Sequence, residues 1–203
     1  MQKKVIALLS ILTLAYITQY LSRLTSAKKL SKITSMSDSN KSRAIFLIES
    51  AFKKYGDGDK RKLAYILATA DHESKFTPSR ECFAKDDKSA RECVKNRSYG
   101  KEINGNVYYG RGLVQLTWYS NYKRVGDIIG ENLVENPDLA LDLKISSKII
   151  VIGMMFGVFT GISLKTYINE SFVDFENSRR VVNGQDRAKI IANMAEQYLA
   201  GLL

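Results

Sequence analysis

The sequence is poor in the residues on which several kinds of enzyme site depend. Its 203 residues include one histidine, two cysteines, two prolines and one tryptophan. The single histidine is His72, whereas the H-E-x-x-H zinc motif needs two imidazoles to bind its metal. A serine or cysteine nucleophile paired with a histidine base would have to use His72 itself. We therefore expect no metal ion and no organic cofactor.

The two cysteines, Cys82 and Cys93, lie in one polar stretch of the chain. An even number of cysteines fits an oxidising compartment, although two are few for such an inference. A Cys82–Cys93 disulfide and a pair of free thiols are both open.

The formal charge of +10 is unevenly spread along the chain. Residues 1–41 carry seven Lys/Arg and one Asp, whereas residues 42–203 carry 24 Lys/Arg and 20 Asp/Glu. The larger part is therefore only mildly basic, which suits a cell wall, an acidic glycan or a membrane surface. A nucleic-acid-binding protein would need a denser basic stripe, so we expect no nucleic-acid partner.

Residues 1–27 have the pattern of a signal peptide or signal-anchor segment. Lys3 and Lys4 precede an apolar run over residues 5–21, which is long for a cleavable signal and short for a spanning helix. Cleavage after Ala27, a permanent anchor and a weak anchor that later leaves the bilayer are the three alternatives. We expect export to the periplasm or envelope of a bacterial host, with residues 5–21 in contact with the inner membrane.

Residues 28–41 predict a polar linker, and residues 42–203 predict one folded domain. Apolar spacing predicts helices over residues 43–55, 60–73, 118–129, 145–159 and 185–199. The almost wholly apolar 145–159 segment predicts the buried central helix. Residues 74–107 predict a long irregular loop of functional importance.

One carboxylate falls on an apolar helix face. Glu73 follows Ala70 by three positions and Ile66 by seven, at the C-terminal end of its predicted helix. Desolvation and the negative end of the helix dipole both favour a protonated carboxyl group there. Such a group can protonate the leaving oxygen in glycoside hydrolysis. An exposed helix-terminal glutamate is the alternative that spacing leaves open.

A ten-residue motif adds a family resemblance. Residues 108–117 read YYGRGLVQLT, which closely resembles the Y-Y-G-R-G-x-x-Q-L-[ST] signature of family 19 glycoside hydrolases. That family contains plant-type chitinases and phage or bacterial cell-wall lysins. Four further matches occur in the family's order: His72-Glu73-Ser74 with H-E-[ST], Asn121-Tyr122 with N-Y, Asn136 to Leu139 with N-P-D-L, and Arg179 to Gly184 with the phage-type R-R-I-[IV]-N-G.

The resemblance implies a role for each matched position. Glu73 matches the family's general acid, and Thr117 matches the hydroxyl residue that helps to hold the attacking water. The matched substrate-binding and cleft-shaping positions are His72, Tyr109, Arg111, Gln115, Asn121 and Asn183. For Arg111 a structural ion pair is equally open. For Trp118 we favour packing in the core over stacking on a sugar.

The second carboxylate departs from the family pattern. Phage-type relatives carry H-E-T-A-G-x-F-x-P-I-x-E, and here the F-x-P-x-x-E end is kept but two residues are missing. Glu81 is our choice for the general base. The alternatives in the same loop are Asp86, Asp87, Glu92 and Glu102. A Cys82–Cys93 bridge would hold this loop in place.

By the resemblance, the fold is mainly α with a minor β part, lysozyme-like, with two lobes around a substrate cleft. We predict a monomeric endolysin-like enzyme that hydrolyses β-1,4 bonds between the amino sugars of peptidoglycan with inversion. A chitinase is one alternative. A catalytically inactive relative that only binds glycan at the envelope is another.

Overall fold

The computed structural model describes residues 39–203. The predicted export segment and most of the predicted linker lie outside these residues. The described part is mainly helical, as predicted, and its strands β1 (Ser79–Arg80) and β2 (Arg111–Gly112) are short. The helices are α2 (Ser39–Tyr55), α3 (Lys60–Ser74), α4 (Asp87–Val94), α5 (Tyr119–Ile129), α6 (Leu143–Met155) and α7 (Ala188–Leu202).

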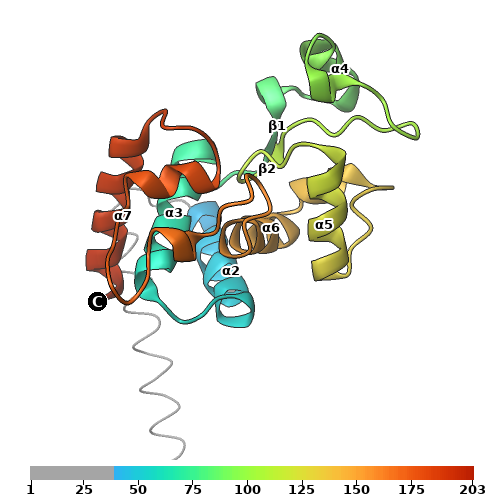
Figure 1. Cartoon of the computed structure of the whole chain (residues 1–203). Helices are drawn as coiled ribbons and strands as arrows, with labels where there is room; N and C mark the ends of the chain where they lie inside the picture. The colour runs from blue at the N-terminus through green and yellow to red at the C-terminus, as the bar shows by residue number, and fades with distance from the viewer. Residues whose placement is uncertain (1–38) are drawn as a thin grey trace, which may run out of the picture.

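The main core lies between α3 and α7 and between α2 and α6, which are the most extensively packed helix pairs (Figure 1). Residues Lys62–Asp71 of α3 are buried without interruption, so this helix is covered on all sides rather than along one stripe. Among residues 39–203, no helix combines the length and the apolar composition that a bilayer crossing requires.

Several element boundaries differ from the predicted ones for local reasons. Helix α2 begins at Ser39, within the predicted linker, because Lys41 is buried with its Nζ atom 3.7 Å from Asp71 Oδ2. Helix α6 ends at Met155, four residues early, and the chain turns back at Gly157, whose φ is +65°. Gly153 permits that turn, since a Cβ atom there would lie 1.8 Å from the Phe159 ring.

The segment predicted as an irregular loop, residues 74–107, contains regular structure. Besides β1 it holds α4 and two 3-10 turns, Glu81–Phe83 and Ser98–Gly100. Asp86 caps α4 by accepting a hydrogen bond from Ser89 N at 2.8 Å. Helix α4, which lies away from α2 and α7 (Figure 1), belongs to a small separate core formed by Ala90, Val94, Val107 and Tyr109.

Candidate active site

Glu73 lies in the last turn of α3 and is paired with a buried cation. Arg179 Nη1 donates to Glu73 Oε1 at 2.6 Å, and the side chains of Arg179 and Glu73 are 4% and 20% exposed. The prediction that Glu73 lies on a partly desolvated face agrees with this exposure. Helical spacing gives no sign of Arg179, which lies far along the chain. The environment of Glu73 is therefore a partly buried ion pair rather than a purely apolar face.

Glu81 follows β1 and is held against the glycine-rich signature. Strand β1 pairs with β2 antiparallel, with Arg80 opposite Arg111. Directly after this pair, Glu81 N donates to Gly110 O at 2.8 Å, and Gly110 N donates back to Glu81 Oε2 at 2.9 Å. Tyr99 donates its hydroxyl to the other carboxylate oxygen, Oε1, at 2.7 Å. Both oxygens of Glu81 thus have a fixed donor.

The other candidate bases have different tasks in the structure. Asp86 is the exposed cap of α4. Asp87 Oδ1 accepts from Arg111 Nη2 at 3.1 Å. Glu92 and Glu102 are 70% and 61% exposed at the side chain, and each is paired with a surface cation. Of the five carboxylates, Glu81 is the one that bonds the backbone of the signature turn at Gly110.

Gln115 and Thr117 lie on the signature turn that also carries Gly110, whose N–H donates to Glu81. Gln115 has φ +54°, an uncommon conformation for a residue with a side chain, of the kind that occurs at functional sites. A Cβ atom at Gly110 would lie 2.8 Å from Gln115 Oε1 and 3.2 Å from Glu81 Oε2. The glycine therefore leaves room for both side chains to approach the backbone at this position. Thr117 Oγ1 donates to Gln115 O at 2.8 Å, and Asn121 Nδ2 donates to Thr117 O at 3.0 Å.

Tyr109 and Arg111 do not line an open surface. They are 0% and 2% exposed, and the Arg111 guanidinium lies 3.5 Å from the centre of the Tyr109 ring. Arg111 Nε donates to Asp138 Oδ1 at 2.8 Å, and Nη1 donates to Val107 O at 3.0 Å. The resemblance placed both residues among the substrate contacts. Because both side chains are buried, they stabilise the signature turn from inside the protein. For Arg111 this is the alternative of a structural ion pair.

The prediction that Trp118 packs in the core is wrong, because this residue is 47% exposed. The φ of +76° at Trp118 turns the chain at the start of α5, and the backbone N–H of Trp118 donates to Tyr108 O at 2.9 Å. This turn directs the indole outward, where it contacts the Tyr99 ring edge to face with centroids 5.4 Å apart. Trp118 is therefore linked to Glu81 through Tyr99.

His72 and Asn183 are each next to one member of the Glu73–Arg179 pair: His72 precedes Glu73 in the chain, and Asn183 bonds the Arg179 backbone. Burial lowers the pKa of His72 below its usual 6.5, so the imidazole is neutral at pH 7. Asn183 is exposed, and its N–H donates to Arg179 O at 3.0 Å. The turn that carries Asn183 thus also fixes the cation that contacts Glu73.

The structure joins Cys82 and Cys93 in a disulfide that ties the turn after Glu81 to α4. We expect the Cys82→Ser/Cys93→Ser variant to lose about 3 kcal/mol of stability, from the loop-closure entropy of a short loop. Thermal unfolding with and without a reductant measures this. The wild type should lose the same stability in reductant and the variant should not respond. A fully reduced wild type with an unchanged melting temperature would contradict the estimate.

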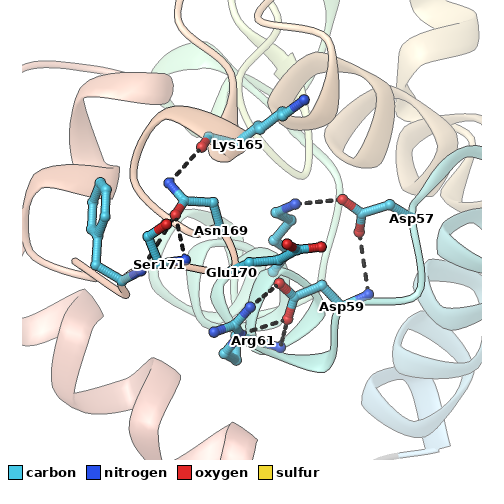
Figure 2. Close-up of a pocket in the computed structure, with 9 residues that line it drawn as sticks. Asp57, Asp59, Arg61, Lys165, Asn169, Glu170 and Ser171 are labelled. Atoms are coloured by element: carbon cyan, nitrogen blue, oxygen red, sulfur yellow. Dashed lines mark hydrogen bonds and ion pairs between the residues drawn. The ribbon is translucent and has the colours of Figure 1, made fainter.

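An open hollow lies elsewhere, at the N-terminal end of α3, opposite to Glu73. It lies between the turn before α3 and the 165–172 loop (Figure 2). Most of its charged groups bond one another: Arg61 donates to both oxygens of Asp59, and Lys62 pairs with Asp57. None of the family motifs falls among the residues that line this hollow, so we place the candidate chemistry at Glu73 and Glu81 instead.

Sequence reasoning missed two residues of this site. Arg179 stands in the R-R-V-V-N-G match, so the motif that drew attention to Asn183 could have identified it. Tyr99 lies outside every motif, in a polar stretch, and no sequence signal marks it.

Comparisons with known proteins agree with the motif resemblance. The sequence profile of class I chitinases matches residues 46–160, which include Glu73, Glu81 and the glycine-rich signature. An endochitinase of Arabidopsis thaliana is 33% identical over 97 residues, covering 47% of this chain and 33% of its own length. An inactive endochitinase of the same plant is 35% identical over 94 residues, covering 44% and 33%. The chain thus spans a third of the length of these curated relatives.

Solved chitinase structures share the fold. Chitinase C from Streptomyces griseus has a TM-score of 0.59 at 23% identity, covering 88% of this chain and 76% of its own. A class IV chitinase from Zea mays has a TM-score of 0.55 at 19% identity, covering 85% and 90%. Because the profile match covers more than half of the 203 residues, the chain belongs to glycoside hydrolase family 19, the class I chitinase family.

Proposed function

We propose that the protein is a glycosidase that hydrolyses β-1,4 bonds between amino sugars of peptidoglycan with inversion, with Glu73 as general acid and Glu81 as general base. The observation that carries this proposal is that both carboxylates are held by fixed donors, Glu73 by Arg179 and Glu81 by Gly110 and Tyr99. An inverting hydrolase needs two such groups, one for the leaving oxygen and one for water.

The chemistry assigns each group one proton transfer. Arg179 holds Glu73 Oε1, which leaves Oε2 to carry the proton that passes to the glycosidic oxygen as the bond to the anomeric carbon breaks. Glu81 accepts a proton from the water whose oxygen attacks that carbon. Because Thr117 donates its hydroxyl hydrogen to Gln115 O, its oxygen lone pairs are available to accept the second hydrogen of that water.

The choice of peptidoglycan over chitin depends on the phage-type R-R-V-V-N-G stretch and on the basic, export-like N-terminus. The relatives named endochitinases favour chitin as the second candidate. Relatives with inactive in their names show that a chain of this kind can lack activity, so an inactive glycan-binding protein is a third outcome.

A direct comparison of substrates tests the choice. The purified full chain is incubated with isolated peptidoglycan and, separately, with soluble chitin oligomers, and new reducing ends are counted over time. We expect a rate on peptidoglycan at least ~10-fold above that on chitin, since a pocket that discriminates between related sugars gains about 1–3 kcal/mol. Faster cleavage of chitin would make the protein a chitinase, and no cleavage of either would leave a binding role.

We also propose that residues 1–27 export the protein and hold it at the inner membrane before release. The support is the sequence pattern of two lysines followed by an apolar run over residues 5–21. Cell fractionation tests this proposal, with full-length protein expected in the membrane fraction. A soluble, processed form cut near Ala27 as the sole product would rule out the anchor.

A further inference from the structure

Tyr99 bonds the candidate base from a part of the chain that no family motif covers. It lies in the Ser98–Gly100 turn, and its hydroxyl donates to Glu81 Oε1 at 2.7 Å. Gly110 N occupies the other oxygen, Oε2, at 2.9 Å. With one donor on each oxygen, the plane of the carboxylate is fixed, and the remaining lone pairs point in defined directions.

The small core around α4 fixes Tyr99 itself. Gly100, the next residue, packs so closely against Val94 that a Cβ atom there would lie 2.0 Å from Val94 O. The Tyr99 ring packs on the same core. The Cys82–Cys93 disulfide links α4 to the residue that follows Glu81. The small core, the disulfide and the hydrogen bond from Tyr99 therefore hold Tyr99 and Glu81 in fixed positions relative to each other.

The other edge of Tyr99 meets a residue that solvent reaches. Its ring contacts Trp118 edge to face, with centroids 5.4 Å apart, and Trp118 is 47% exposed. An aromatic side chain kept half exposed by a left-handed backbone is suited to contact a ligand. A ligand that binds against Trp118 would thus be in contact with the residue that packs on Tyr99, the donor to Glu81.

We infer that Tyr99 is a positioning residue for Glu81, which it orients toward the attacking water and connects to the exposed Trp118. This inference rests on the proposed function of Glu81. Burial first, and then the hydrogen bond to Glu81, raise the pKa of Tyr99 to about 12. The phenol therefore keeps its proton, and remains a donor, at every pH at which the enzyme is expected to work.

The Tyr99→Phe variant tests the inference, because it removes only the hydroxyl. We expect kcat to fall roughly 10- to 100-fold, the usual effect of losing a hydrogen bond to a charged group, while KM changes less than about twofold. Tyr55→Phe, on α2, is the matched control and should behave like the wild type.

A second measurement does not depend on activity. The ¹³C signal of the Tyr99 ring, identified by its absence from Tyr99→Phe, is followed in alkaline solution in the wild type and in Glu81→Gln. Tyr99 should ionise at lower pH in Glu81→Gln, because the adjacent negative charge is gone. An unchanged titration, or a Tyr99→Phe variant with wild-type kcat, would overturn the inference. An inactive wild type with a shifted Tyr99 titration would overturn the proposed function and leave only the contact between Tyr99 and Glu81.

Discussion

Glu73→Gln should lower kcat on peptidoglycan by roughly 10²- to 10⁴-fold, the usual contribution of a general acid. Glutamine cannot release a proton to the leaving oxygen, but its amide oxygen can still accept the hydrogen bond from Arg179. Folding and glycan binding should therefore persist. Initial rates of reducing-end formation and co-sedimentation with insoluble peptidoglycan measure the two properties separately.

The matched control is Glu196→Gln, which makes the same change at an exposed position of α7. It should keep wild-type activity, binding and melting temperature. If Glu73→Gln lyses peptidoglycan as fast as Glu196→Gln does, Glu73 is not the general acid and the proposed mechanism fails. If Glu73→Gln also loses binding, the loss of activity reflects damage to the site rather than a missing proton.

Arg111→Met should lower the free energy of unfolding by about 1–3 kcal/mol, because Arg111 is the buried member of an ionic network whose carboxylates, Asp87 and Asp138, are 39% and 49% exposed. The change leaves Asp87, Asp138 and the Val107 carbonyl without a donor that each now has. For a chain of this size the melting temperature should fall by roughly 2–12 °C. Thermal denaturation followed by circular dichroism gives the value.

Arg124→Met provides the comparison for this substitution. Arg124 is exposed on α5 and has one long hydrogen bond, 3.4 Å from Nη2 to Phe156 O. Its loss should change stability by less than about 0.5 kcal/mol, as is usual for surface positions. Equal effects of the two variants would mean that the Arg111 network does not support the signature turn.

The helical frame followed from the sequence because periodic apolar residues and turn residues act locally. Gly56 directly follows α2, and Asp59 caps α3 by accepting a hydrogen bond from Arg61 N at 3.0 Å. Helix α4 was not predicted because half of its eight residues are charged and its buried apolar residues, Ala90 and Val94, pack with Val107 and Tyr109 from further along the chain. A short polar helix carries no periodic signal strong enough to outweigh a loop assignment.

The residues of the site were predictable only in part, because sequence patterns report local structure whereas the site depends on contacts between distant positions. The motifs identified Glu73 and the signature turn, and helical spacing placed Glu73 at a helix end. The contacts that define each carboxylate come from far along the chain: Arg179 lies 106 positions from Glu73, and Gly110 lies 29 positions from Glu81. Trp118 was misplaced because composition favours burial of a tryptophan, whereas its positive φ, which composition does not reveal, turns it outward.

In the proposed mechanism, Glu73 and Glu81 hydrolyse a glycosidic bond with water as the nucleophile. Digestion of peptidoglycan in ¹⁸O-labelled water, followed by mass spectrometry of the fragments, identifies that nucleophile. We expect one ¹⁸O atom at each new reducing end for the wild type, and roughly 10²- to 10⁴-fold slower formation of such ends for Glu73→Gln. Fragments that end in anhydro-sugars without the label would show that water is not the nucleophile, and would contradict the role of Glu81 as the base.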